Sequence, residues 1–204
     1  MYVPHHFKLD DLSLARRLIE EQPLGLLVGR DPQGDSFASN LPLFWGSAGE
    51  RWWLDGHVAR ANPQSAWLGD QPEQLLVFSG PDAYVSPRHY EHERNVPTWN
   101  YLALHLRARA ELIDEPAPKD ALLKRLIARH EPGYAAQWRG LPEDFQQKLL
   151  GAIVGLRLHV LGWEFKAKLS QNRSALERQR LREQYEAGTA RERELAQWMQ
   201  RLGL

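Results

Sequence analysis

The sequence predicts an α+β fold in which an antiparallel sheet or barrel carries helices between and after its strands. Between residues 24 and 86, short apolar runs alternate with loops rich in Gly, Pro and Asp, as in sheets built from hairpins. Two longer stretches, 99–113 and 153–169, alternate apolar and polar residues, which is typical of half-buried strands. The C-terminal residues instead space their apolar side chains as an amphipathic helix does.

The individual elements follow from the same patterns. Asp10 and Asp11 precede an amphipathic helix that Pro23 ends. Strands are expected at 24–29, 36–46, 51–58, 73–80, 83–86, 99–113 and 153–169. Helices are expected at 12–21, 119–130, 141–152, 171–187 and 189–203. Because no repeat, low-complexity tract or linker divides the chain, we expect one domain over residues 1–204, with a helical C-terminal extension over about residues 171–204.

Composition excludes several classes of function. The 204 residues include no cysteine, which excludes thiol catalysis, thiolate metal sites and a disulfide framework. Lys and Arg together number 26, as do Asp and Glu, whereas a dedicated nucleic-acid binder usually has a basic excess. The N-terminus has no signal-peptide pattern, and no run reaches the roughly 20 apolar residues of a membrane-spanning helix. We therefore expect a cytoplasmic protein that does not enter a membrane.

The stretch GHVARANP, residues 56–63, joins a strand to a helix and is a candidate phosphate site. Arg60 offers a fork of donors, and Asn62 and Pro63 open a helix whose first N–H groups favour anions. An ordinary turn with a solvated Arg60 is the simpler interpretation of the spacing alone.

A histidine pair raises the question of a metal. His89 and His92 lie three residues apart in an aromatic-rich loop, beside Glu91 and Glu93. This spacing suits a divalent metal on a helix, but no third ligand is evident. We expect no metal site.

The stretch VPTWNY, residues 96–101, gathers large rings and an amide at the start of a strand. Trp99 and Tyr101 alternate onto one face and Asn100 onto the other. The two rings are either ordinary packing or a surface that meets a planar ligand or a second subunit.

The stretch KLSQNRS, residues 168–174, places amide and guanidinium groups near a helix start. Ser170 is expected to cap a helix whose first turn holds Gln171 and Arg173. Such a turn suits an anion or a partner surface, or is simply exposed. No Walker loop, GxGxxG, GxSxG or HExxH motif accompanies these segments.

Six segments follow one another over residues 1 to about 173: MYVP, GHVARANP, LLVFSGPDAYVSP, YEHERNVPTWNY with a following His105, AIVG and KLSQNR. Together they closely resemble the PaiB family of FMN-binding negative transcriptional regulators. The resemblance implies an antiparallel split β-barrel of the FMN-binding type, shared with the pyridoxamine phosphate oxidase and flavin reductase group. It also implies a homodimer with FMN at the subunit interface.

The resemblance implies a set of cofactor-binding residues as well. They are His57, Arg60, Asn62, Trp99, Asn100, Tyr101, Lys168, Ser170, Gln171 and Arg173. Two positions depart from the family pattern: Asn40 stands where a histidine precedes Leu-Pro, and His89 stands near a tryptophan position.

The function implied by the resemblance is that of an FMN-binding homodimeric regulator of transcription, with direct DNA contact disfavoured by the neutral charge. The alternative is an FMN-dependent oxidoreductase of the split-barrel type, in which the cofactor carries the redox chemistry. A third possibility, which Asn40 keeps open, is a dimeric scaffold or sensor that uses haem, another ligand or none. No catalytic acid or base stands out in the sequence.

Overall fold

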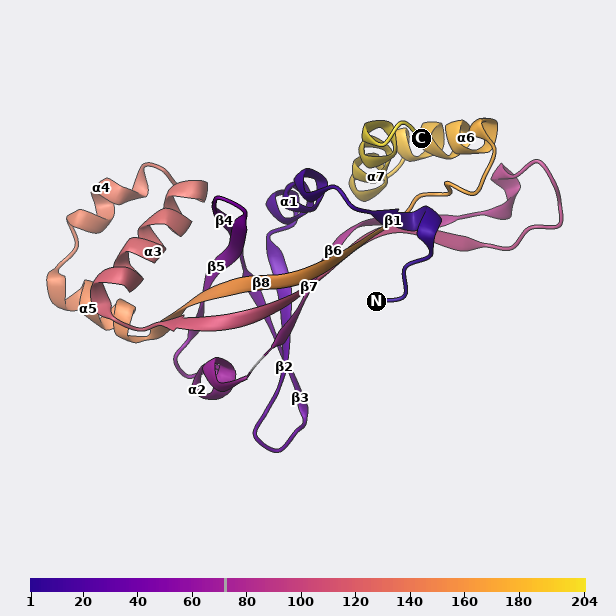
Figure 1. Cartoon of the computed structure of the whole chain (residues 1–204). Helices are drawn as coiled ribbons and strands as arrows, with labels where there is room; N and C mark the ends of the chain where they lie inside the picture. The colour runs from indigo at the N-terminus through magenta and orange to yellow at the C-terminus, as the bar shows by residue number, and fades with distance from the viewer. Residues whose placement is uncertain (72) are drawn as a thin grey trace. The chain divides into compact units, whose positions relative to one another are not determined.

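The computed structural model describes residues 1–71 and 73–204 and confirms the α+β fold (Figure 1). The chain forms two compact units. The first unit consists of Met1–Ala15, Ser79–His105 and Glu164–Leu204, and the second of Arg16–Phe78 and Leu106–Trp163. None of the described helices is both long and apolar enough to cross a membrane.

The strands follow one hydrogen-bonded path, β3-β2-β6-β7-β8-β5-β4, and β1 pairs with β8. They are β1 (Lys8–Leu9), β2 (Leu24–Arg30), β3 (Ser36–Pro42), β4 (Phe44–Ala48), β5 (Arg51–Ala59), β6 (Gln74–Val85), β7 (Thr98–Ile113) and β8 (Ile153–Lys168). The α-helices are α1 (Leu12–Glu21), α2 (Gln64–Trp67), α3 (Pro116–His130), α4 (Tyr134–Arg139), α5 (Glu143–Gly151), α6 (Ala175–Glu186) and α7 (Ala190–Arg201). Short 3₁₀ helices lie at η1 (His5–Phe7), η2 (Leu68–Asp70) and η3 (Pro87–His89).

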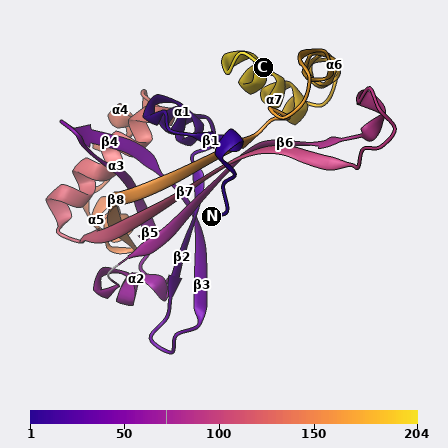
Figure 2. The same cartoon turned by 45° about the vertical axis from the view of Figure 1, so that its right-hand side comes forward.

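The second unit is built around alternating strand residues that point inward. Leu27, Leu54 and Leu158 are fully buried, and each such side chain contributes about 1.5–3 kcal/mol of hydrophobic stabilisation. Helix α3 covers this sheet by packing Leu122 and Leu126 against Phe44. Figure 2 shows the β2–β3 hairpin beside α2, where the rings of Phe37 and Trp67 meet edge to face with centroids 5.9 Å apart.

The first unit combines one end of the long strands with the C-terminal helices. Helices α6 and α7 pack against each other, and each begins with a reciprocal capping box, Ser174 with Glu177 and Thr189 with Glu192. The buried Trp198 meets the ring of Phe165 edge to face, with centroids 6.1 Å apart. The C-terminal helices therefore share the core of the first unit.

Three of the predicted strands are divided or joined differently in the structure. The strand expected at 36–46 is two strands, because Leu43 leaves the ladder and donates its N–H to the carbonyl of Pro23 at 2.8 Å. The strands expected at 73–80 and 83–86 are one strand, β6. The Gly80–Pro81 step does not break it, and the Gly80 carbonyl accepts from Nη2 of Arg191 at 3.2 Å.

Candidate functional site

A cavity of about 230 Å³ in the first unit brings together four of the residues predicted for the cofactor site. Its walls come from η1, the loop after η3, the start of β7 and the chain that leaves β8. The lining residues are His6, Phe7, Tyr90, Val96, Thr98, Asn100, Lys168, Ser170, Asn172 and Arg173.

Three hydrogen-bonded residues, Ser170, Asn100 and Tyr185, form a buried polar network at this cavity. Asn100 is fully buried on β7, donates Nδ2–H to the Tyr185 hydroxyl at 3.3 Å and accepts from Ser170 Oγ at 3.0 Å. Burial raises the pKa of Tyr185, so this hydroxyl keeps its proton. Ser170 has a φ of 63°, which makes it the one non-glycine residue in the left-handed region within the described chain. The bond to Asn100 holds this strained backbone, and such strain is common at ligand sites.

Lys168 reaches across the cavity from the end of β8. Its Nζ donates to the Trp99 carbonyl at 2.8 Å and also contacts Thr98 Oγ1. Burial is the main cause that lowers the pKa of Lys168, and the nearby charge of Lys166 acts in the same direction. The ammonium group thus has neutral oxygen partners in a place where water is partly excluded.

Arg173 supplies the second cation. Its guanidinium lies over the Tyr90 ring, 3.9 Å from the centroid, and Nη1 donates to Asn95 Oδ1 at 2.7 Å. Within the described residues, neither Arg173 nor Lys168 forms an ion pair with a carboxylate, and no Asp or Glu lines the cavity. Both cations are partly buried and no carboxylate lines this cavity, which makes it suitable for an anion, although Arg173 also interacts electrostatically with the buried Glu177.

The other predicted residues of the first unit lie elsewhere. Gln171 folds back on its own turn, accepting from the Leu169 N–H at 2.8 Å and donating to the Ala167 carbonyl at 2.6 Å. Trp99 and Tyr101 lie on the face of β7 opposite Asn100, and 52% of Trp99 is exposed. The ring of Trp99 meets that of Tyr84 edge to face, with centroids 6.0 Å apart.

The prediction that Ser170 caps a helix is wrong. Helix α6 begins four residues later than expected, at Ala175, and Ser174 is its N-cap. The positive φ of Ser170 gives the chain a tight turn at the cavity instead. Lys168 therefore lines the cavity from the end of β8, and Ser170 and Arg173 line it from the turn that follows and not from a helix terminus.

Three predicted residues, His57, Arg60 and Asn62, lie in the second unit. Arg60 donates Nε–H to the Gly151 carbonyl at 2.7 Å, and both its terminal nitrogens contact the Asp114 carboxylate. Its Nη2 also donates to the Ile153 carbonyl at 3.2 Å. These bonds join the end of β5 to the end of β7, the end of α5 and the start of β8, so they occupy the donors that a phosphate would need.

His57 and Asn62 form fewer hydrogen bonds than Arg60. Asn62 forms an Asx turn by accepting from the Gln64 N–H at 3.0 Å, and its Nδ2 donates to Ser39 Oγ at 2.9 Å. The half-buried His57 ring has no hydrogen-bond partner for Nδ1 among the described residues, and burial lowers its pKa. Because α2 has only four residues and its first N–H is bound by Asn62, the predicted helix-terminal phosphate cradle has little free donor capacity.

Several residues of the cavity escaped sequence reasoning. Tyr90 and Asn172 lie in segments that the sequence singled out but were not predicted as ligands, and His6 and Phe7 belong to an N-terminal segment far away in sequence. The Arg60–Asp114 contact was equally hidden, because it depends on which strand ends meet. Only the clustering of Asn100, Ser170 and Arg173 had a signal, namely the two polar segments that flank apolar strands.

The sequence profile of a family described as "Putative FMN-binding domain" matches residues 1–161. The chain belongs to this family, and the predicted resemblance to PaiB proteins and the predicted FMN-binding domain are confirmed. The chain is 32% identical over 176 residues to Protease synthase and sporulation protein PAI 2 of Bacillus subtilis (strain 168), covering 85% of this chain and 84% of that one. It is also 26% identical over 171 residues to an uncharacterised protein of Aspergillus fumigatus, covering 65% of this chain and 66% of that protein.

Solved structures show the fold. The flavocytochrome Anf3 from Azotobacter vinelandii matches with a TM-score of 0.62 and 23% identity, covering 80% of this chain and 70% of that chain. The FAD and heme binding protein from Mycobacterium smegmatis matches with a TM-score of 0.61 and 20% identity, covering 79% and 73%. These similarities confirm the predicted split-barrel fold.

The first-unit cavity, of about 230 Å³, offers groups for the phosphate and the ribityl chain of FMN. The cofactor carries an anionic phosphate, a hydroxylated ribityl chain and a planar ring system. Lys168 and Arg173 offer positive charge for the phosphate, and Ser170 and Asn172 offer polar groups for the hydroxyls. Arg60, by contrast, would contact a phosphate only after releasing Asp114.

Proposed function

We propose that this protein is an FMN-binding homodimer that acts as a negative regulator of transcription in the cytoplasm, with FMN as its controlling ligand. Membership of the FMN-binding family and the similarity to the Bacillus subtilis sporulation protein support the regulatory assignment. Of the ten cofactor-binding residues predicted from the sequence, we place Asn100, Lys168, Ser170 and Arg173 at the flavin.

One observation carries the cofactor part of the proposal. Lys168 and Arg173 face a single cavity without a carboxylate partner, next to the Asn100–Ser170 pair. A bound phosphate would place negative charge beside both cations and accept hydrogen bonds from them. When bound, FMN supplies one-electron and two-electron redox chemistry. In this proposal Asn100, Lys168, Ser170 and Arg173 bind and orient the FMN.

The exposed rings support the homodimer. Trp99 and Tyr84 form an apolar pair on the open face of the first-unit strands, and a large exposed aromatic pair is typical of a partner surface. A zero formal net charge also provides little repulsion between copies.

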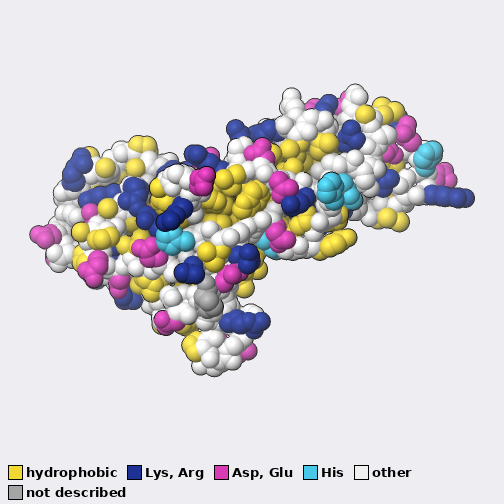
Figure 3. Space-filling model, viewed as in Figure 1, with side chains coloured by type: hydrophobic (Ala, Val, Ile, Leu, Met, Phe, Trp, Pro, Cys, Tyr) yellow, Lys and Arg dark blue, Asp and Glu magenta, His cyan; other side chains and the backbone are white. Residues whose placement is uncertain are grey.

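We propose that regulation works through a partner protein and not through direct DNA contact. On the face in Figure 3, Lys and Arg are interspersed with Asp and Glu and do not form one basic stripe. Direct operator binding would require such a stripe for phosphate contacts. Salt-sensitive binding of the purified protein to its own upstream DNA in a gel shift would contradict this part of the proposal.

The decisive experiment compares FMN with riboflavin, which lacks the phosphate. We expect flavin fluorescence titrations to give saturable binding at one FMN per chain and affinity for riboflavin at least tenfold weaker. Lys168→Gln should weaken FMN binding about tenfold or more, since it removes a charge-assisted contact of about 1.5–3 kcal/mol, and should narrow the difference between the two ligands.

Lys8→Gln is the matched control for this titration. Lys8 lies in the same unit but forms an exposed ion pair with Asp10, outside the cavity. Its FMN affinity should equal that of the unmodified protein. If Lys168→Gln and Lys8→Gln bind FMN with equal affinity, the phosphate of FMN does not bind in this cavity.

An FMN-dependent oxidoreductase remains the second candidate, supported by the fold shared with a flavocytochrome. This function would require reduction of bound FMN by an electron donor such as NADPH at a rate far above that of free FMN. A bound but inert flavin across a panel of donors would favour the regulator.

A further inference from the structure

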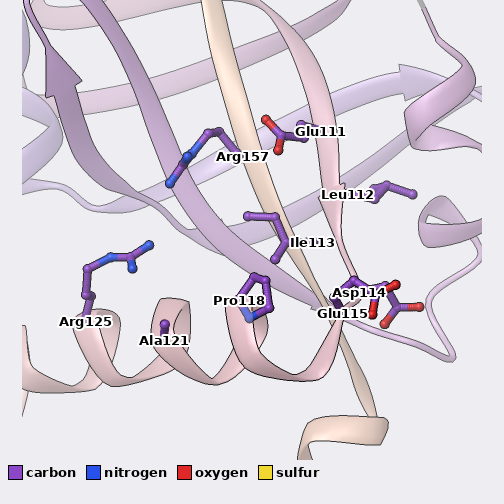
Figure 4. A pocket seen from close by; sticks show the side chains of 9 residues that line it. All are labelled: Glu111, Leu112, Ile113, Asp114, Glu115, Pro118, Ala121, Arg125 and Arg157. Carbon is purple, nitrogen blue, oxygen red and sulfur yellow. The ribbon is translucent and has the colours of Figure 1, made fainter.

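A second cavity, of about 390 Å³, lies wholly in the second unit and has no role in the proposed FMN site. It forms where β7 ends and α3 begins, with β8 behind it. Its lining residues are Glu111, Leu112, Ile113, Asp114, Glu115, Pro118, Ala121, Arg125 and Arg157 (Figure 4).

The side chains divide this cavity into three parts. In Figure 4, Arg125 and Arg157 lie at one end, Asp114 and Glu115 lie at the other, and Pro118 lies between them. The middle is apolar, because Ile113 and Ala121 join Pro118 there. A ligand of this cavity therefore meets two guanidinium groups, then an apolar wall, then Glu115 and the paired Asp114, and Glu111 lines the cavity on the side of Arg157 (Figure 4).

Arg157 is held in a fixed orientation. Its Nε and Nη2 donate to the buried Asp55 carboxylate at 2.9 and 3.1 Å, and its guanidinium lies 4.6 Å from the centroid of the Trp53 ring. Nη1 has no acceptor within the described chain, so one edge of the planar fork stays available. Because the orientation is set before binding, a ligand loses little free energy in ordering this side chain.

Arg125 adds a second guanidinium to the same end. Its Nη2 lies 3.5 Å from Asp55 Oδ2, beyond a good hydrogen bond, and none of its N–H groups has a closer acceptor among the described residues. Asp55 is thus shared by both guanidinium groups, and the Glu111 carboxylate also interacts electrostatically with Arg157. The nearby Glu111 is engaged by His159, with Nε2 and Oε2 2.7 Å apart.

We propose that this cavity binds a small organic monocarboxylate with an apolar body. The carboxylate lies between Arg125 and Arg157, where two guanidinium groups match its two oxygens. The apolar body covers Ile113 and Pro118. Glu115 repels a second negative charge, which selects against dicarboxylates, whereas Asp114 is already paired with Arg60 and Lys119. Inorganic phosphate has no apolar body to cover the wall.

The test is isothermal titration calorimetry on the full-length protein, with 3-phenylpropionate as the probe and 3-phenylpropanol as its neutral match. We expect saturable binding of the acid and binding of the alcohol at least tenfold weaker. Arg125→Gln should weaken acid binding tenfold or more. Arg129→Gln, one turn further along α3, should leave it unchanged, because Arg129 pairs with Glu20 outside the cavity.

Two further measurements, urea unfolding and amide chemical shifts, make the calorimetry decisive. Urea unfolding should give equal midpoints for both arginine variants and the unmodified protein, so that lost binding reports the site and not the fold. Amide chemical shifts on titration should change in residues 111–118. Equal binding of acid and alcohol, unchanged affinity in Arg125→Gln, absence of saturable binding, or equal affinity for inorganic phosphate would each overturn the proposal.

Discussion

Arg60 shows how one residue type can serve two purposes that a sequence does not separate. A guanidinium beside a turn suggests a phosphate ligand, but here it joins three strand ends through Asp114 and two carbonyls. The same bonds, with help from Lys119, hold the pKa of Asp114 well below its usual range. Arg60 therefore acts first as a clamp of the second unit.

We expect Arg60→Ala to lower the urea midpoint at pH 7 and to change FMN affinity by less than twofold. Because the folded-state pKa of Asp114 is depressed, its ion pairs stabilise the fold above the unfolded pKa, about 3.9. This contribution is lost as the pH falls through the folded-state pKa. The difference in midpoint between the two proteins should thus persist down to about pH 4 and shrink below it.

Asp114→Asn distinguishes the clamp from a phosphate ligand, because it frees Arg60 from its carboxylate. If Arg60 acts as a clamp, Asp114→Asn should lower the stability of the protein and leave its FMN affinity unchanged. Tighter FMN binding in Asp114→Asn, together with weaker binding in Arg60→Ala, would restore Arg60 to the cofactor site.

At the scale of elements, the sequence predicts best where a signal is local. Helix α7 begins at Ala190 because Thr189 and Glu192 form the expected capping box. The division of β3 from β4 depends instead on Leu43 bonding to Pro23, twenty residues earlier, which no periodicity reveals. Helix α4 was missed for a similar reason, since its six residues are too few for a clear period.

The prediction of the site likewise succeeds where its signal is local. The alternation of β7 correctly separates Asn100 from Trp99 and Tyr101. That Ser170 faces Asn100 depends on a long-range contact and a positive φ, and neither has a signature in KLSQNRS. Sequence patterns therefore identified polar segments but not the direction in which each side chain points.

We expect Thr189→Ala to lower the free energy of unfolding by about 1 kcal/mol, because the N–H of Glu192 loses its side-chain acceptor at the start of α7. Urea denaturation followed by circular dichroism measures the change. Thr189→Ser keeps the hydroxyl and should retain most of the stability. Equal losses in both variants would show that the methyl group, and not the cap, stabilises this end of the helix.

At the scale of the whole molecule, the open question is how two copies and the cofactor depend on each other. The proposed homodimer covers the aromatic pair Trp99 and Tyr84, and Trp99 also presents the carbonyl that holds Lys168 at the first-unit cavity. Burial of Trp99 by a partner would fix this carbonyl and with it the ammonium group. Dimer formation and FMN binding should then be thermodynamically linked.

We expect Trp99→Glu to weaken the dimer at least tenfold in sedimentation equilibrium, since it places a charge in an apolar contact. Phe145→Glu is the control, because Phe145 is similarly exposed but lies on α5 of the second unit. Linkage requires that saturating FMN tighten the dimer of the unmodified protein by the same factor by which dimerisation tightens FMN. If FMN leaves the dimer constant unchanged while Trp99→Glu still dissociates it, the aromatic pair is an interface that works independently of the flavin. If Phe145→Glu dissociates the dimer and Trp99→Glu does not, the copies meet through the second unit instead.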